Sequence, residues 1–342
     1  MTYKKVKEGE ATILAPKEEK ISGDLPVFYN PVMKTNRDIS IALLNALEKE
    51  YLDIALPLAG TGIRAIRFFK ELKKENIKQI CINDCNEEAI KVINENFKLN
   101  NITKEDIEIN QTEASLFMLK HAGFNYIDVD PFGSPNPFLD ASCKKLSRDG
   151  ILAVTATDTA PLSGTYTKVC RRKYWAEPKK DHMMHETGLR ILIRKIQLIA
   201  VQYERALTPI YSYSDEHYMR VFLKCKKGKK HCDEILSQHK MFNDAGPLWL
   251  GQLWDEDLAE KIMSLNPCTL TKLIKDESKI SSIGFYNIPK LCKKHKTGVQ
   301  KKFDQIIELI KAKGYQASRT HFDKEGIRTN MTEEEVEKVV IG

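Results

Sequence analysis

The sequence predicts an α/β protein: a doubly wound parallel sheet followed by a second, smaller α+β region. Apolar segments of strand length alternate with segments whose apolar residues recur at helical spacing. This alternation is typical of parallel sheets that carry helices on both faces. The chain has 342 residues, a length that favours two domains. We expect the first domain to span residues 1–254 and the second to span residues 255–342, where the sequence becomes helical and lysine-rich.

The predicted elements follow one another in a regular order. After a leader of short strands, a helix is expected from Ile39 to about Lys49, with Asp38 as its cap. Five buried strands are expected in the segments "LDIALPLAG", "IKQICIND", "DIEIN", "FNYIDVD" and "GILAVTATDT". A long helix is expected in "ETGLRILIRKIQLIAVQYERA". Two strands joined through "SDEH" then close the sheet with an antiparallel edge.

Composition restricts the class of protein. A hydrophobic fraction of 42% is sufficient for a packed core, and no apolar run approaches the roughly 18 residues of a membrane span. The N-terminus lacks the pattern of an export signal. The eight cysteines are scattered and form no C-x-x-C pair, which fits a reducing cytoplasm and predicts no metal site. The net charge of +7 permits a polyanionic partner without requiring one.

Ends of the predicted strands carry candidate nucleotide-binding groups. Gly60 and Gly62 follow the first strand at a turn into a helix, and Asp84 ends the second strand. In doubly wound sheets, glycine turns of this kind approach phosphate or other anionic groups, and such an acid accepts hydrogen bonds from ribose hydroxyls. Glu113 and Ala114, after the third strand, suit the edge of an adenine. Each residue has a plainer alternative, since these glycines also form ordinary turns and these acids also cap helices.

The fourth strand ends in an unusual turn, "DVDPFGSP". Asp130 and Phe132 stand side by side on a proline-braced loop, which indicates a site for a flat ring that bears an amino group. A nicotinamide enzyme would need a hydride-transfer site here, and this strand does not resemble one. We therefore expect S-adenosylmethionine as the adenosine-containing cofactor. The alternative is that Asp130 caps a turn and Phe132 belongs to the core.

The "DPF" turn resembles the D-P-P-Y and N-P-P-Y motifs of methyltransferases that act on planar amino nitrogens. The longer strings "DVDPFGSP", "GILAVTATDTAPLSG", "HETGLRILI", "GPLWLG", "ASRTHF" and "LPVFYNPVMKTNRDI" are similar to the tRNA guanine-26 N2-dimethyltransferase family in its archaeal-type form. This resemblance covers nearly the whole chain. It implies a class I, Rossmann-like methyltransferase domain and a C-terminal domain that recognises tRNA.

Residue roles follow from the resemblance at matching positions. It implies that Asp130 is the catalytic acid and that Phe28 and Phe132 sandwich the target base. The cofactor contacts that it implies are Arg37, Arg64, Asp84, Glu113 and Ala114, beside the glycine turn at Gly60 and Gly62. A cytoplasmic, monomeric, metal-free enzyme with tRNA as its partner is expected.

This chain departs from the family pattern at three places. Leu56 stands near the position where the family usually has an acid before the glycine turn, and position 113 is Glu where Asp is commoner. Cysteines that bind zinc in some members are missing before "GPLWLG". Two other functions remain as alternatives: methylation of another planar amino nitrogen, such as adenine N6 or a protein glutamine, and non-catalytic RNA binding. The lysines of "KLCKKHKTGVQKK" (290–302) fit an RNA partner or a solvated face.

Overall fold

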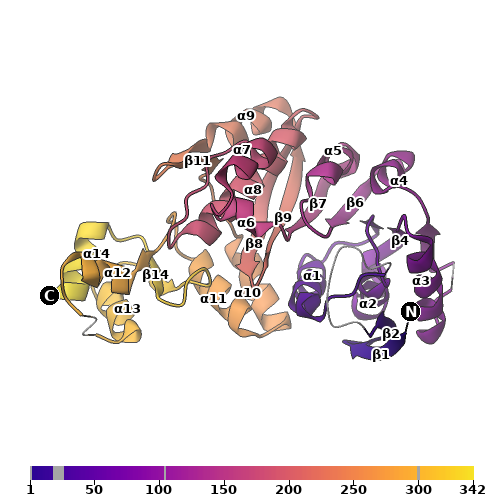
Figure 1. The fold of residues 1–342 in the computed structure, drawn as a ribbon, viewed down its shortest axis with the longest axis horizontal. Helices are drawn as coiled ribbons and strands as arrows, with labels where there is room; N and C mark the ends of the chain where they lie inside the picture. Colours follow the sequence, from indigo (N-terminus) through magenta and orange to yellow (C-terminus); the bar gives the residue numbers. More distant parts are fainter. Residues whose placement is uncertain (1, 18–26, 104, 299–300) are drawn as a thin grey trace. The chain divides into compact units, whose positions relative to one another are not determined.

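A computed structural model describes residues 2–17, 27–103, 105–298 and 301–342, which form two compact units (Figure 1). Unit 1 consists of Met1–Thr157, Ile196–Thr208 and Phe222–Ile235. Unit 2 consists of Asp158–Lys195, Pro209–Val221 and Leu236–Gly342. The domain boundary that we expected after residue 254 stays a prediction.

Unit 1 begins with an antiparallel hairpin and a helix. The hairpin pairs β1 (Tyr3–Glu8) with β2 (Ala11–Pro16). Helix α1 spans Lys34–Ala46 and is preceded by a 3₁₀ turn at Pro31–Met33. The predicted helix start at Ile39 is therefore wrong, and Asp38 lies inside α1 instead of capping it. The reason is the Asn30-Pro31 pair: the Asn30 side chain accepts from the Val32 amide, which starts the helical turn several residues earlier.

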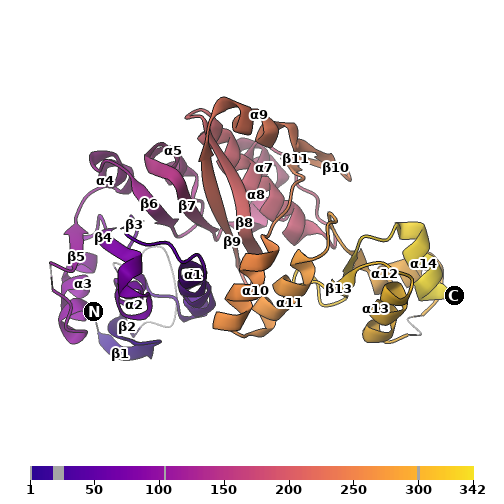
Figure 2. The ribbon, with the colours of Figure 1, turned by 180° about the vertical axis from the view of Figure 1, so that it is seen from behind.

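The main sheet of seven strands has the order β5-β4-β3-β6-β7-β9-β8 (Figure 2). Its strands are β3 (Leu52–Leu56), β4 (Ile77–Asn83), β5 (Ile107–Asn110), β6 (Phe124–Val129), β7 (Leu146–Ala156), β8 (Arg205–Asp215) and β9 (Tyr218–Lys227). Strands β3 to β7 pair in parallel, as the sequence predicts. The adjacent strands β8 and β9 are joined by two residues and therefore run antiparallel, and they contribute residues to both units.

Helices cover both faces of the parallel strands (Figures 1 and 2). Helices α1, α2 (Ile63–Glu71) and α3 (Glu87–Leu99) lie on one face, and α4 (Ala114–Lys120) and α5 (Asn136–Lys145) lie on the other. The strands read as continuous apolar runs because neither face meets water. The remaining elements of unit 1 are the 3₁₀ turn Lys74–Asn76 and α9 (Lys229–Ser237), of which the last two residues belong to unit 2.

Unit 2 combines helices with two small sheets. Its helices are α6 (Thr159–Leu162), α7 (Thr167–Tyr174), α8 (Met184–Val201, shared with unit 1), α10 (Glu256–Leu265), α11 (Thr269–Ser278), α12 (Ile288–Lys294), α13 (Phe303–Ala312) and α14 (Glu333–Ile341). One sheet pairs β10 (His239–Phe242) with β11 (Ala245–Trp249), and the other has the order β12 (Tyr286–Asn287), β14 (Gly326–Thr329), β13 (Ala317–Arg319). The predicted mixture of helices and strands in the C-terminal region is confirmed. No helix of the described residues has both the length and the apolar character that crossing a bilayer requires.

A buried network of charges crosses unit 2. Arg328, on β14, donates to Glu186 on α8 at 2.6 Å and to Glu277 on α11 at 3.0 Å. Glu186 also accepts from Arg190, one helical turn away, at 2.9 Å. These four side chains are almost completely buried, so each charge depends on its partners. The network therefore fixes β14 and α11 against α8.

Candidate active site

The order of strands creates a switch point between β3 and β6. The chain runs from β3 outward to β4 and β5, then returns to place β6 on the other side of β3. Loops at the carboxyl ends of two such strands diverge and leave room for a ligand. The glycine turn follows β3, and Asp130 follows β6, so the structure brings these two predicted features to the switch point.

Gly60 and Gly62 both have left-handed backbone, with φ of 55° and 75°. A Cβ atom on Gly60 would lie 2.8 Å from the backbone carbonyl oxygen of Phe28. The turn therefore requires glycine for conformation and for close approach of the segment that carries Phe28. Gly62 is the N-cap of α2, so amides of the first turn of that helix are directed toward the carboxyl end of the sheet.

Asp84 supports the glycine turn from the next strand. Its carboxylate accepts from the Gly60 amide at 2.9 Å and from the Asn86 amide at 3.0 Å. Burial raises the pKa of Asp84, although these backbone donors oppose the change. A carboxylate in this position is poorly compensated for its lost hydration, so further donors such as ribose hydroxyls would stabilise it. The structure thus assigns Asp84 a structural bond and leaves its ribose contact as a prediction.

Glu113 lies at the N-cap of α4 and is exposed. Its side chain accepts from the Leu116 amide at 2.8 Å. Burial tends to raise the pKa of Glu113, but hydrogen bonds from Ser115 and Leu116 outweigh it and lower the pKa. Ala114 is buried, at 4% exposure. Glu113 is therefore a helix cap in this structure, and the adenine contacts of both residues stay predictions.

Arg64 connects the glycine-turn helix to the predicted catalytic acid. Its guanidinium donates to Asp130 and lies 3.3 Å from the carboxylate of Asp128, which belongs to β6. It also donates to Asn36 Oδ1 at 2.9 Å and to Ser40 Oγ at 3.0 Å, both on α1. Arg64 is 8% exposed, whereas the Asp130 side chain is 19% exposed. The acid is thus held from behind by a buried cation, with part of its carboxylate facing outward.

Phe28 and Phe132, the two rings that the family resemblance assigns to the target base, lie next to each other. Their ring centroids are 5.8 Å apart and their planes meet at 71°, so they form an edge-to-face pair. A base stacked between them requires parallel rings twice a stacking distance apart, so both rings must rotate and separate to form a sandwich. Phe132 is 60% exposed, which excludes it from the core. The loop beneath it is fixed by the Gly133 amide, which donates to Thr157 Oγ1 at 2.6 Å.

Arg37 has partners within the protein. It forms two hydrogen bonds of 2.6 Å with the Glu8 carboxylate and donates to the Asn30 carbonyl at 3.1 Å. Burial raises the pKa of Glu8, but Arg37 and Arg67 outweigh this and lower it. Arg37 therefore positions the segment after Phe28, and its contact with a cofactor stays a prediction.

The structure adds residues that sequence reasoning did not single out. Asn83, completely buried, donates to the carbonyls of Pro57 and Thr112 at 3.1 and 3.0 Å and accepts from the Thr112 amide at 3.0 Å. It joins the loops that follow three adjacent strands. The sequence signal for Asn83 is a polar residue at the end of an apolar strand. For Asp128 and Glu8 the sequence carries no such signal, because their partners are distant in sequence.

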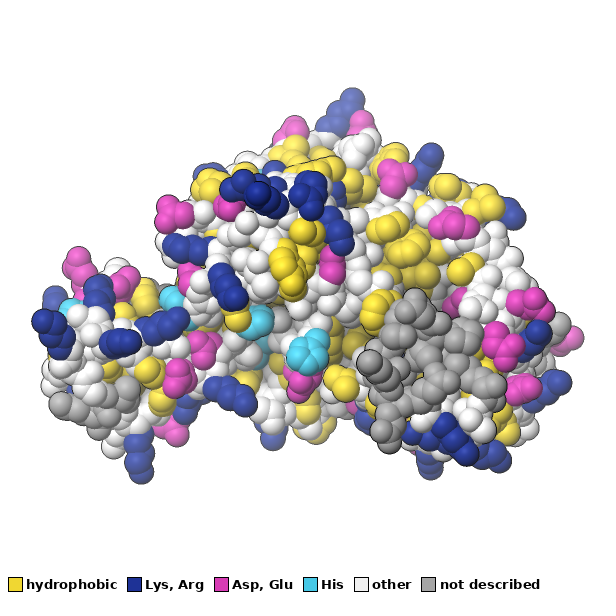
Figure 3. Space-filling model, in the orientation of Figure 1, with side chains coloured by type: hydrophobic (Ala, Val, Ile, Leu, Met, Phe, Trp, Pro, Cys, Tyr) yellow, Lys and Arg dark blue, Asp and Glu magenta, His cyan; other side chains and the backbone are white. Residues whose placement is uncertain are grey.

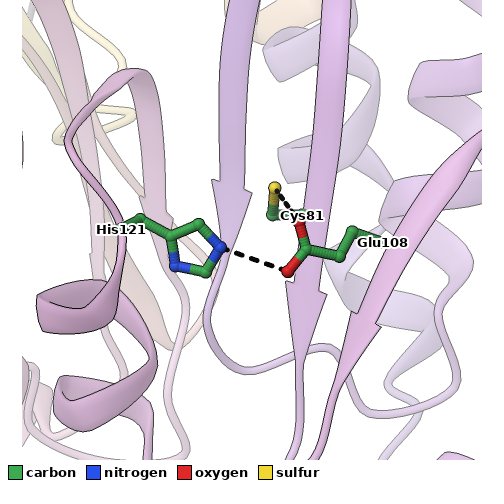
Figure 4. A group of neighbouring side chains, drawn as sticks. All are labelled: Cys81, Glu108 and His121. Atoms are coloured by element: carbon green, nitrogen blue, oxygen red, sulfur yellow. Dashed lines mark hydrogen bonds and ion pairs between the residues drawn. The ribbon is translucent and has the colours of Figure 1, made fainter.

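A cluster of potential metal ligands lies on β4, β5 and the end of α4 (Figure 4). Cys81 donates to Glu108 at 3.4 Å, and His121 Nε2 lies 3.2 Å from the same carboxylate. Glu108 also accepts from Gln79 and Asn110, so each of its oxygens already accepts at least one hydrogen bond. Burial raises the pKa of Glu108, but Asn110, Cys81 and His121 outweigh this and lower it. Hydrogen bonds explain this arrangement without an ion.

Comparison with known proteins agrees with this geometry. The model of the family described as "TRM: N2,N2-dimethylguanosine tRNA methyltransferase" matches residues 9–245 and 238–341. The chain belongs to this family. A relative from Aquifex aeolicus, named tRNA (guanine(26)-N(2)/guanine(27)-N(2))-dimethyltransferase, is 39% identical over 97% of this chain and 94% of its own. A tRNA (guanine(26)-N(2))-dimethyltransferase from Methanocaldococcus jannaschii is 36% identical over 96% of both chains.

A solved structure extends the family likeness to the fold. Trm1 from Pyrococcus horikoshii, in complex with S-adenosyl-L-methionine, is 34% identical, and the likeness covers 98% of this chain and 99% of that one, with a TM-score of 0.89. The predicted class I methyltransferase fold and the family resemblance are therefore confirmed. S-adenosyl-L-methionine is the ligand of that relative.

Proposed function

We propose that this protein transfers one or two methyl groups from S-adenosyl-L-methionine to the exocyclic N2 of guanine 26 in tRNA. The observation that carries the proposal is the placement of Asp130, backed by Arg64 and beside Phe132, at the switch point of the sheet. Family membership and the named activities of relatives support the substrate. Methylation of adenine N6 or of a protein glutamine, and non-catalytic RNA binding, have no comparable support.

The residues at the switch point fit the cofactor. The Gly60 turn leaves no room for a side chain, and amides at the start of α2 face the same edge of the sheet. Asp84 carries a partly desolvated carboxylate that gains from ribose donors. We assign cofactor binding to Gly60, Gly62 and Asp84, with Arg64 and Arg37 behind them. Glu113 and Ala114 are assigned to the adenine.

The chemistry needs help because the lone pair on guanine N2 is conjugated into the ring. When bound, S-adenosyl-L-methionine would supply an electrophilic methyl group, whose bond to sulfur breaks as the bond to N2 forms, with S-adenosyl-L-homocysteine as the leaving group. As the N–C bond forms, N2 becomes positively charged and more acidic. Asp130 accepts a hydrogen bond from the amino group and then takes its proton, which is typically worth about 10²–10⁴-fold in rate. Arg64 keeps the Asp130 carboxylate in one orientation, so that the carboxylate lone pairs not bonded to Arg64 face the amine.

The base must leave the stacked interior of tRNA before it can reach Asp130. Phe28 and Phe132 replace the lost stacking, at roughly 1–3 kcal/mol per base. Their edge-to-face contact is the arrangement before a base enters. We assign the methyltransferase role to residues 1–254 and tRNA recognition to residues 255–342, in a cytoplasmic monomer whose methyl transfer involves no metal.

Nucleoside mass spectrometry of tRNA tests this proposal. Incubation with the protein and S-adenosyl-L-methionine should produce N2-methylguanosine or N2,N2-dimethylguanosine. Transcripts in which guanine 26 is replaced by adenine should gain neither product. Methylated adenine in either transcript, or equal methylation of both at guanine, would refute the proposed site of modification.

A further inference from the structure

Helix α7 and the residues around it present an exposed cationic surface. Cys170 and Tyr174, four residues apart, are completely buried, so the opposite side of the helix faces outward. Tyr166 and Trp175 flank the helix and are 59% and 49% exposed. We define the α7 surface by its exposed cations and these aromatics: Tyr166, Lys168, Arg171, Arg172, Lys173, Trp175 and Lys180.

This surface carries an excess of positive charge. Residues 165–180 contain six lysines and arginines and one acid, Glu177. Arg171 pairs with Glu177, and Lys173 lies 3.2 Å from Asp158. Within the part of the chain that the structure describes, Lys168, Arg172 and Lys180 have no acidic partner within ion-pair distance. In Figure 3, Lys and Arg side chains gather over the position at which Figure 1 draws α7.

The C-terminal region has a more mixed charge. Residues 286–341 contain twelve lysines and arginines but also eight acids. Lys294 lies 2.9 Å from Glu333 and 2.8 Å from Glu337, so its charge is balanced within the fold. Val299 and Gln300 of the lysine-rich run lie outside the described residues.

Three aromatic side chains near these lysines, Tyr286, Tyr315 and Phe322, are buried or bonded within the protein. Phe322 is buried, and the hydroxyls of Tyr286 and Tyr315 donate to the Met331 carbonyl and to Glu335. None of these three rings is exposed, unlike those of Tyr166 and Trp175.

We propose that the α7 surface binds the sugar–phosphate backbone of tRNA, an inference that rests on the proposed function. Unpaired, exposed lysines and arginines are the groups that replace the counterions of phosphates. Tyr166 is exposed and can stack on an unpaired base next to that backbone, whereas the Trp175 ring already has the Lys195 ammonium over it.

The test is the salt dependence of tRNA binding. The triple variant Lys168→Ala, Arg172→Ala, Lys180→Ala removes the unpaired cations and leaves the buried face of α7 unchanged. Each lost phosphate contact should flatten the slope of log K against log salt by about 0.7–0.9. We therefore expect a slope shallower by about 2, together with weaker binding at low salt. Fluorescence anisotropy with labelled tRNA over a range of KCl concentrations measures both.

A matched control separates local contacts from net charge. The variant Lys4→Ala, Lys5→Ala, Lys7→Ala removes the same charge from exposed positions on β1. It should keep the unaltered slope, and both variants should keep their unfolding temperature and their affinity for S-adenosyl-L-methionine. An unchanged slope in the α7 variant, while the unaltered protein methylates guanine 26 normally, would overturn this inference alone. Absence of methylated guanine with the unaltered protein would instead overturn the proposed function.

Discussion

Replacing Glu186 by glutamine should strongly destabilise unit 2. The carboxylate accepts from Arg190, Arg328 and the Gly284 amide, and it is completely buried. Glutamine keeps the shape but leaves two buried guanidinium groups without this counter-charge. Removing one partner from a buried ion pair typically costs about 3–5 kcal/mol.

The pKa of Glu186 gives an independent magnitude. Burial alone raises this pKa, but Arg328 and Arg190 outweigh it and lower it from 4.5 to about 2. The difference of about 2.5 pH units, at about 1.36 kcal/mol each, corresponds to roughly 3 kcal/mol. Because the folded-state pKa is lowered, this stability is present above pH 4.5 and is lost as the pH falls toward 2. Between pH 5 and pH 3 the unaltered protein should lose about 2 kcal/mol more than the variant.

Urea unfolding at several pH values measures both effects. The matched control is Glu87→Gln, which removes a carboxylate from an exposed pair with Lys91 and should leave the unfolding midpoint unchanged. If Glu186→Gln behaves like this control at pH 7, the network does not hold unit 2 together. If the free energy of unfolding of the variant and of the unaltered protein changed equally with pH, the lowered pKa of Glu186 would be refuted.

Three further predictions concern the switch point. Gly60→Ala should abolish cofactor binding in calorimetry, because it adds a clash with the Phe28 carbonyl to a strained φ. The control Gly314→Ala also has a positive φ but open space around it, and it should bind the cofactor normally. Equal affinities of the two variants would refute the role of the Gly60 turn in cofactor binding. Affinity for S-adenosyl-L-methionine should fall as the pH drops through the raised pKa of Asp84, since ribose donors favour its charged form. The variant Asp84→Asn should bind weakly at neutral pH and lack this pH dependence. A variant with the same pH profile as the unaltered protein would exclude the contact between Asp84 and the ribose. Phe132→Ala should lose about 1–3 kcal/mol of transition-state stabilisation on folded tRNA, with an unchanged melting temperature because the ring is exposed; a large drop in melting temperature would indicate packing.

The sheet could be predicted from sequence because its signal is local. Strands β3 to β6 are short segments with apolar residues that end in turn residues, and each is followed by a helix, α2 to α5. The start of α1 is harder to predict, because a pair such as Asn30-Pro31 is compatible with an isolated turn as well as with the opening of a helix.

The sequence does not show which groups hold the predicted site residues in place. The motif around Asp130 indicates the acid. It does not indicate that Arg64, 66 residues earlier in the chain, is the group that holds this acid. That pair depends on β6 returning beside β3, which only the strand order shows. Asp84 and Glu113 bond to backbone amides, and the sequence has no pattern that distinguishes such caps from ligand contacts.

The central claim is that Asp130 accepts the proton of guanine N2. Single-turnover methylation of tRNA by Asp130→Asn tests it most directly, because asparagine keeps the size of the side chain while losing the basic carboxylate. We expect the rate to fall at least about a hundredfold, with unchanged affinity for S-adenosyl-L-methionine. A variant that forms N2-methylguanosine at the rate of the unaltered protein would contradict the account.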